Sequence, residues 1–558
     1  MDDDEASKLY LMRLRSNVRV SNWRESPAST AAAAAAAAVP RRTRTRRRRK
    51  ECVFILISIV ALCLLSFVGN KRSQHNLRRK ADLDLEKLEK CDLSTYPLWK
   101  VSELKELDLS GCGGENLNLP DNPNLWSSFS SLKKLDLNNN QLNRLPQSME
   151  NLTSLEILFL SENEFEAIPE VVGKLKKLRV ISLRGNLITN VSTLNLPTAT
   201  LEWLILTNNR IQTIEADIKD LKLLKKLMLS HNNISEIPAE LGDCQYLELV
   251  RLADNNIRSV PASVLTLSKL AWISLSGNPF SSVRSTSAQE AKVITESELE
   301  INETDVLGSG ASGTVFKGIY RGEDVAVKMF KATSKGSDGN SEDEAHINSL
   351  IDTPYAISAL GVIPAPEGEG KYKGMVMKLL DGTNPMGKVP SFRTVTRDEG
   401  AAPHATNLST QQVMSAIWNI ASALEYIHTS VGICHGDVYL HNILRDGKGV
   451  ARLSDWGASF VYDRTNVEVA SKIEKIEVLA FGRLVQDLFN WNLNVAVPDS
   501  TELGSYLITK SGSKTMTLIA SILQADQSKR PTFREIKETL ATIPEFEPFS
   551  AAAGSLVT

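Results

Sequence analysis

The sequence is poor in cysteine, histidine and aromatic residues, with six Cys and seven His among 558 residues and only 6% Phe, Trp and Tyr. Two cysteines lie in one apolar run and four are scattered, at Cys52, Cys63, Cys91, Cys112, Cys244 and Cys434. Because no CxxC pair occurs, this usage predicts neither a disulfide framework nor a cysteine metal site. It suits a reducing compartment.

Charge is missing from one stretch, CVFILISIVALCLLSFVG at residues 52–69. Eighteen residues at 1.5 Å each just cross ~30 Å of hydrocarbon, so we interpret the stretch as a transmembrane helix. A cleaved signal peptide fits less well, since the run exceeds the usual ~7 to 15 residues and follows about fifty others. A buried helix is the remaining alternative, but eight Lys and Arg directly precede the run.

Charge is divided unevenly along the chain. Residues 1–80 carry 18 Lys and Arg against 6 Asp and Glu, so the remaining 478 residues carry 46 against 60. The basic N-terminal part is therefore expected to face a membrane or another anionic partner, and the remaining residues are acidic overall. Residues 1–51, which include a run of eight alanines at 31–38, are expected to be disordered.

The pattern LxxLxLxxN recurs every 23 residues in the first half of the chain. Its first Leu falls at Leu132, Leu155, Leu178, Leu201, Leu224, Leu247 and Leu270, and an Asn follows eight residues later at Asn140, Asn163, Asn186, Asn209, Asn232, Asn255 and Asn278. This pattern resembles the leucine-rich repeat family, which implies a curved α/β solenoid over residues 82–282. The Leu triplets fill a shared core, and each Asn satisfies backbone groups at a turn.

The third and fifth residues of each copy are expected to point outward on the concave sheet, because side chains alternate along a strand. They include the apolar residues Ile157, Phe159, Val180, Trp203, Ile205, Met228, Leu249 and Trp272. Isolated exposed apolar residues are normal, but a contiguous stripe with two Trp is more often a contact surface. We interpret these eight residues, called the concave stripe below, as a docking face for a protein partner or for this chain's own second half.

Residues 435–457 read HGDVYLHNILRDGKGVARLSDWG. They place in order Asp437, Asn442 and Asp455, the groups that phosphoryl transfer from ATP needs to orient a hydroxyl and to hold Mg²⁺. Each Asp alone could be a turn residue or a helix cap. The ordered set predicts catalysis by Asp437 and metal binding by Asn442 and Asp455.

A glycine-rich stretch, LGSGASGTVFKG, begins at residue 307, and VAVK ends at Lys328. A lone GxGxxG also fits dinucleotide binding, but here it leads into a strand and not a helix. Gly308, Gly310 and Gly313 therefore predict a β-hairpin over phosphates. Lys328 would neutralise the α and β phosphates and pair with an acid on the following helix, for which Glu344 is the better candidate and Glu342 the second.

Together these motifs resemble the leucine-rich-repeat protein kinases of plants and algae, in a tyrosine-kinase-like, non-RD form. GMVMKLLDG at 374–382 resembles the strand and hinge that clasp adenine, which implies nucleotide contacts from Val315, Met377 and Leu379. EVLAFGRLVQDL and KRPTFREI, from residues 477 and 529, resemble two helices of protein kinases. The letters HGD and DW also resemble aminoglycoside and choline kinases, which lack those two helices.

Three departures limit the resemblance. Gly436 replaces the Arg that would bind an activation-loop phosphate. The stretch from Asp455 to Glu477 is short and has no APE, so Arg530 lacks its expected partner. Tyr439 and His441 stand where a phosphate-contacting Lys or Arg is common, which would lower the rate.

The expected organisation is a solenoid followed by a two-lobed α+β protein kinase domain, with one transmembrane helix. The expected segments are 1–51, a disordered basic region; 52–69, the membrane helix; 82–282, the repeats; 283–300, a polar linker; 301–545, the kinase domain; and 546–558, a tail. We interpret the chain as a single-pass membrane protein kinase that uses ATP and Mg²⁺, phosphorylates a protein and binds no nucleic acid. The alternatives are a scaffold that binds nucleotide without transfer, and a small-molecule kinase.

Two arguments about sidedness disagree. Basic residues are more numerous before the span than after it, and this bias sends the rest of the chain across the membrane. A kinase needs ATP and Mg²⁺, both flanks are basic and the bias is modest, so we favour the cytoplasmic side for the repeats and the kinase.

Overall fold

The computed structural model describes residues 91–96, 101–113, 117–281, 291–310, 312–331, 339, 341–366, 371–493, 497 and 514–549. The predicted transmembrane helix at 52–69 and the basic N-terminal region lie outside these residues. Among the helices that are described, none is long and apolar enough to cross a membrane. Residues 91–96 belong to one compact unit and contain the 3-10 helix Leu93–Thr95, whereas the described residues from 101 onward belong to another.

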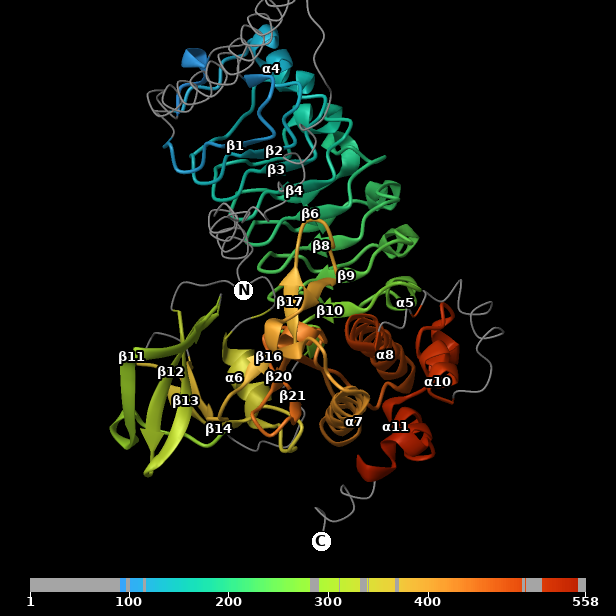
Figure 1. Ribbon diagram of the computed structural model, residues 1–558. Coiled ribbons are helices and arrows are strands. Elements are labelled where there is room, and N and C mark those ends of the chain that lie inside the picture. Colours follow the sequence, from blue (N-terminus) through green and yellow to red (C-terminus); the bar gives the residue numbers. More distant parts are fainter. Residues whose placement is uncertain are drawn as a thin grey trace, which may run out of the picture. The chain divides into compact units, whose positions relative to one another are not determined.

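The repeats form a parallel sheet of eight short strands in the order β1-β2-β3-β4-β6-β8-β9-β10 (Figure 1). The strands are β1 (Glu106–Asp108), β2 (Lys134–Asp136), β3 (Ile157–Phe159), β4 (Val180–Ser182), β6 (Trp203–Ile205), β8 (Lys226–Met228), β9 (Leu249–Arg251) and β10 (Trp272–Ser274). From β2 onward each residue pairs with the one 23 positions later, for example Trp203 with Lys226. The sequence period is therefore the register of the sheet.

The conserved spacing of the Asn residues has a direct structural reason. Asn255, for example, donates from Nδ2 to the carbonyl oxygens of Leu229 and Leu252, each at 3.0 Å, and its Oδ1 accepts the N–H of Ile234. Its side chain thus closes one coil and ties it to the next. The other repeats repeat this pattern, which satisfies backbone groups that the strands leave unpaired.

Short helices and a small sheet complete the outer side of the solenoid. They are the α-helices α4 (Pro123–Ser128) and α5 (Ala262–Leu265), the 3-10 helices Gln147–Asn151, Glu170–Lys174, Thr193–Asn195, Ala216–Asp220, Ala239–Asp243 and Pro279–Ser281, and the paired strands β5 (Asn190–Val191) and β7 (Thr213–Ile214).

The first lobe of the second half is a five-stranded antiparallel sheet in the order β11-β12-β13-β15-β14 with one helix against it. Its elements are β11 (Leu299–Ser309), β12 (Gly313–Tyr320), β13 (Glu323–Phe330), α6 (Ser341–Ser349), β14 (Ala359–Pro364) and β15 (Tyr372–Lys378). Ile294 is fully buried in this lobe, and its N–H donates to Val362 O. Part of the predicted polar linker therefore packs as the edge of the lobe.

The second lobe is mostly helical. It contains α7 (Thr410–Tyr426), α8 (Val467–Leu488), α10 (Lys514–Ile522) and α11 (Phe533–Ala541). Small strands accompany them: β16 (Asn384–Pro385), β17 (Gly387–Pro390), β18 (Asp398–Ala401), β19 (Ile433–Cys434), β20 (Ile443–Arg445), β21 (Ala451–Leu453) and β22 (Phe460–Val461). Short 3-10 or π turns occur in this lobe at Pro403–Ala405, Ile427–Val431, Leu440–Asn442, Phe489–Leu493, Gln527–Lys529 and Pro544–Phe546. Another 3-10 turn, Glu296–Glu298, precedes β11 in the first lobe.

The concave stripe of the repeats is covered by the second half of the chain. The hairpin of β17 and β18 reaches the strands of the solenoid (Figure 1), where the ring of Phe392 lies 5.3 Å from both Phe159 and Trp203. One continuous hydrophobic cluster contains the stripe and the core of the helical lobe. Of the two interpretations of the stripe, the structure thus supports docking within the chain, and the stripe is not open to a second protein.

Candidate active site

Lys328 and Glu344 form an ion pair between β13 and α6. Glu344 is 2% exposed, so the pair is buried. Burial alone lowers the pKa of Lys328, but the negative charges of Glu344 and Asp455 outweigh it and hold that pKa above its ordinary value. Lys328 therefore stays charged. Glu342, the second candidate, instead accepts the backbone N–H of Lys371 at 2.7 Å.

The three glycines of the hairpin between β11 and β12 have different surroundings. A Cβ on Gly313 would lie 2.3 Å from Met329 O, so this position needs Gly for the close approach of β12 and β13. A Cβ on Gly308 or Gly310 would meet nothing within 4 Å. Packing does not require glycine at those two positions, which leaves their bare backbone available to a ligand.

A separate apolar cluster lies under this hairpin. Its buried members are Ala326, Met375 and Met377, with Val315, Phe330, Ile357, Ala359 and Leu379 packed around them. Val315 pairs in register with Lys328, so the cluster adjoins the charged end of the site. The structure thus brings together the three residues expected to contact adenine, Val315, Met377 and Leu379.

Asp437 and Asn442 contact each other in the loop between β19 and β20, which the sequence predicts to be the catalytic loop. Asn442 Nδ2 donates to Asp437 Oδ2 at 2.7 Å and to Asp437 O at 3.0 Å. Because the amide nitrogen makes both bonds, the carbonyl oxygen of Asn442 is the atom that could bind a cation. The loop is anchored from α8, where Glu477 Oε1 accepts the N–H of Gly436 at 2.8 Å.

Asp455 follows β21 with a left-handed backbone at φ 62° and has an exposed side chain. Desolvation by the surrounding protein raises its pKa, but the positive charge of Lys328, together with smaller contributions that include the N–H of Gly457, outweighs desolvation and leaves the pKa below its ordinary value. The carboxylate is therefore ionised, as a cation ligand must be. Among the described residues no group of three or more His, Cys, Asp or Glu could hold a metal ion. Mg²⁺ commonly binds one or two carboxylates together with substrate phosphates, so the chemistry of the predicted ligands Asn442 and Asp455 is compatible with this ion.

The Trp of DWG is structural. Trp456 is 1% exposed, and its indole Nε1 donates to Ile357 O at 2.8 Å. His435 lies against this ring, at 4.8 Å between centroids, and its Nε2 is 3.1 Å from Ser454 O. These contacts join the two halves of the catalytic segment.

Sequence reasoning missed two residues at this site. Arg251, on β9 of the repeats, forms an ion pair with Asp437. It occupies the fifth position of its repeat, where three of the six other repeats have an apolar residue and none has a basic one, and that exception is the available signal. The sequence marks Glu477 only as part of a helix pattern, although its carboxylate also binds Gly436 and His428.

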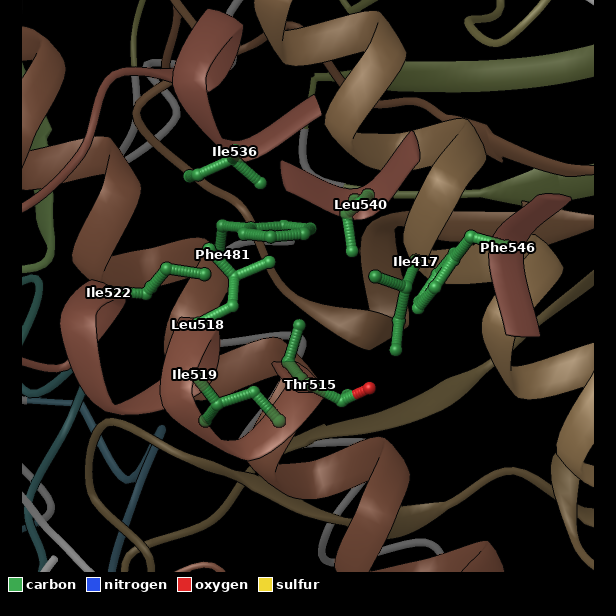
Figure 2. Close-up of a pocket in the computed structure, with 10 residues that line it drawn as sticks. Ile417, Phe481, Thr515, Leu518, Ile519, Ile522, Ile536, Leu540 and Phe546 are labelled. Carbon is green, nitrogen blue, oxygen red and sulfur yellow. The ribbon is translucent and has the colours of Figure 1, made fainter. Parts of the chain in front are cut away.

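Figure 2 shows an apolar cavity that is separate from these residues. It lies among α7, α8, α10 and α11, and Ile417, Phe481 and Leu540 are among its lining side chains. Thr515 is the one residue with a polar side chain in this lining. Such a cavity offers little to orient a substrate, so it is a gap in core packing and not the nucleotide site.

Family models match both halves of the chain. The protein kinase domain matches residues 301–474, and leucine rich repeat models match residues 130–188 and 223–244. The chain contains leucine-rich repeats and a protein kinase domain. This confirms the order of the two predicted modules.

Three curated relatives illustrate the similarity. A probable LIM domain-containing serine/threonine-protein kinase of Dictyostelium discoideum is 28% identical over 45% of this chain and 40% of its own length. The LRR receptor-like serine/threonine-protein kinase EFR of Arabidopsis thaliana is 27% identical over 29% of this chain and 16% of its own. The human receptor tyrosine-protein kinase erbB-4 is 28% identical over 31% of this chain and 12% of its own length. The chain therefore spans less than half the length of each.

Proposed function

We propose that the chain is a membrane-anchored, ATP-dependent protein kinase of the tyrosine-kinase-like, non-RD type. The observation that carries the proposal is the buried ion pair of Lys328 and Glu344, whose positive charge also acts on Asp455. A buried charge pair is costly to maintain, and such pairs concentrate at functional sites. Here it lies beside a hairpin with bare backbone and an apolar cluster, which are the parts that a nucleotide needs.

The residues have separate roles in this proposal. Gly308 and Gly310 let the backbone approach the phosphates, Gly313 fixes the hairpin, and Val315, Met377 and Leu379 contact adenine. Lys328, held by Glu344, neutralises phosphate charge. Asn442 and Asp455 would hold Mg²⁺, which supplies charge stabilisation at the phosphates when bound.

Asp437 is the proposed catalytic base. It orients the acceptor hydroxyl and accepts its proton as the hydroxyl oxygen bonds to the γ-phosphorus of ATP. The bond between that phosphorus and the bridging oxygen breaks, and ADP leaves with the electron pair. The products are a phosphate ester and ADP, so no further reactant is required.

The test is transfer of labelled phosphate by the full-length protein in detergent, with Mg²⁺, a peptide library and a panel of small hydroxyl compounds. We expect Asp455→Asn to abolish transfer and Lys328→Met to reduce it almost as much. Charge stabilisation at the phosphates contributes several kcal/mol to such reactions. Asp352→Asn and Lys448→Met, both at exposed positions, are the matched controls. Wild-type transfer by Asp455→Asn would support a nucleotide-binding scaffold in place of an enzyme.

A second candidate is a kinase for small molecules. It is favoured by one observation: α8 begins at Val467, so only residues 458–466 separate the DWG turn from this helix. A segment this short offers little platform for an extended peptide. Labelling of a compound from the panel, without labelling of any peptide, would support this candidate.

The membrane anchor at 52–69 and the cytoplasmic side of the kinase are part of the same proposal. The need for ATP and Mg²⁺ supports the cytoplasm. Cys91 and Cys112 are each disulfide-bonded, whereas Cys244 and Cys434 are free, so the argument from a reducing compartment does not hold for the start of the repeats.

Glycosidase treatment of the native protein tests the side. Asn190 and Asn233 are exposed and lie in N-x-S/T sequences, so a mobility shift after treatment would place the repeats in the lumen or outside the cell. We expect no shift, and digestion of the kinase domain by protease added to the cytoplasmic face of sealed vesicles.

A further inference from the structure

Each of the three departures from the usual kinase sequence lies against a residue of the repeats. The first is Gly436, which has a left-handed backbone at φ 74°. A Cβ at this position would lie 2.5 Å from Ile273 O, on strand β10 of the repeats. No side chain fits here, so the Arg common in protein kinases is excluded by the solenoid itself.

Another departure is the lack of Lys and Arg in HGDVYLHN, where Tyr439 and His441 stand instead. Arg251 of β9 supplies one, since its Nη1 donates to Gly436 O at 2.8 Å and its Nη2 pairs with Asp437 Oδ1. Arg251 is 2% exposed, and a buried guanidinium requires such compensation. Because Asn442 Nδ2 donates to Asp437 Oδ2, each oxygen of the Asp437 carboxylate has a partner.

Tyr439, in the same loop, also contacts the repeats. Its ring stacks on Trp272 of β10 with 4.4 Å between centroids and an interplanar angle of 6°, and Trp272 Nε1 donates to Val438 O at 3.1 Å. On the other side His441 Nδ1 lies 2.5 Å from Asp398 Oδ1. The two residues that replace the usual phosphate contacts therefore fix the loop.

The remaining departure is the missing acidic partner of Arg530. Arg530 is 1% exposed, and its Nη2 donates to Ser268 O of the repeats at 2.7 Å. Burial lowers its pKa to about 10, which still leaves it charged. Nearby, Gln527 Nε2 donates to Leu265 O at 2.9 Å. In place of the acidic partner expected in protein kinases, the Arg530 guanidinium therefore donates to backbone carbonyls, one of which belongs to the repeats.

We propose that the last repeats are a permanent part of the active site, an inference that rests on the proposed function. In this site Arg251 is a positioning residue, which holds the Asp437 carboxylate toward the acceptor hydroxyl. Permanence follows from the continuous hydrophobic cluster that joins the concave stripe to the helical lobe. A module that dissociated would expose a surface with two Trp and Phe159.

The first test compares Arg251→Met, Arg251→Lys and the exposed control Arg258→Met in the full-length protein in detergent. We expect Arg251→Met to lower kcat by about tenfold or more while the Kd for Mg-ATP stays at the wild-type value. Arg251→Lys keeps the charge but not the two-pronged geometry, so it restores part of kcat. Arg258→Met leaves kcat unchanged.

Faster or equal transfer by Arg251→Met would overturn the proposal, and faster transfer would identify the contact as inhibitory. If no form of the protein transfers phosphate although Mg-ATP binds, the proposed function fails, which is a different result. Melting temperatures of all variants are measured alongside kcat.

The second test does not depend on whether Arg251→Met folds. A protease site inserted at residues 283–290 allows the full-length protein to be cut between repeats and kinase after folding. We expect the two fragments to elute together and transfer to be unchanged. Separation of the fragments with retained or increased transfer would contradict the proposal.

Discussion

His428 and Glu477 form a buried pair under the catalytic loop, with 2.6 Å between Nε2 and Oε2. Their side chains are 3% and 1% exposed. Burial raises the pKa of Glu477, but the hydrogen bonds and charge of His428 and the N–H of Gly436 outweigh it, so the pKa is lowered. The same carboxylate thus joins α8, the end of α7 and the loop that carries Asp437.

We expect Glu477→Ala to destabilise the protein by about 3 to 5 kcal/mol, because it leaves buried partners without their acceptor. Denaturant unfolding of the full-length protein measures this. Glu468→Ala, at an exposed position of the same helix, is the control and should have little effect. Similar unfolding curves for the two variants would contradict the anchoring role.

The raised pKa of the buried Asp487 should make the stability of the protein depend on pH. Burial raises its pKa to about 6, and the ion pair with Arg397 at 2.5 Å does not reverse this. Between the unfolded and folded pKa values the native state binds more protons, so the free energy of unfolding falls as pH rises through about 6.

The decrease should be on the order of 2 to 3 kcal/mol between pH 4 and pH 7. Asp487→Asn still accepts a hydrogen bond from Arg397 but does not titrate, so we expect its unfolding free energy to lack this decrease. Unfolding measured at several pH values checks it. Parallel pH curves for wild type and variant would show that Asp487 is not the group responsible.

The Asn ladder of the repeats predicts a sharp contrast between neighbours. Asn255→Ala removes three donated bonds and one accepted bond in the core, at about 1 to 3 kcal/mol for each buried group left unsatisfied. Asn256→Ala, at an exposed side chain, should change little. Thermal unfolding compares the two, and equal melting temperatures would rule out the ladder as a source of stability.

The glycine hairpin predicts a difference among its three glycines. Gly313→Ala should destabilise the first lobe by about 1 to 3 kcal/mol, because its Cβ would overlap Met329 O. Gly308→Ala and Gly310→Ala should fold normally but bind Mg-ATP more weakly. Circular dichroism and nucleotide binding separate the two effects; normal binding by both Gly308→Ala and Gly310→Ala would count against phosphate contacts at this hairpin.

Local patterns predicted much of this structure because each depends on one physical rule. The LxxLxLxxN period predicts the register of Trp203 and Lys226, since identical coils must stack in identical positions. The ordered site motifs predict Lys328, Glu344, Asp437, Asn442 and Asp455 as a set, and the structure pairs Lys328 with Glu344 and Asp437 with Asn442. Such residues are close in sequence or belong to one recurrent arrangement.

The contact between Arg251 and Asp437 could not be predicted in the same way, because it joins residues 186 positions apart on different modules. Sequence alone left open which surface would cover the concave stripe. Likewise Ser268 contributes a backbone carbonyl to Arg530, and a carbonyl carries no sequence signal. Only the packed structure identifies such partners.

The fixed 23-residue register also limits how this architecture can change over evolution. Neighbouring strands are about 4.8 Å apart, so each repeat inserted between β9 and the kinase would move Arg251 one strand spacing away from Asp437. Repeats added before β1 would move nothing at the catalytic loop. The solenoid can therefore gain or lose repeats at its far end. At the end that carries Arg251 and Trp272, the number of residues that precede the kinase domain must stay fixed.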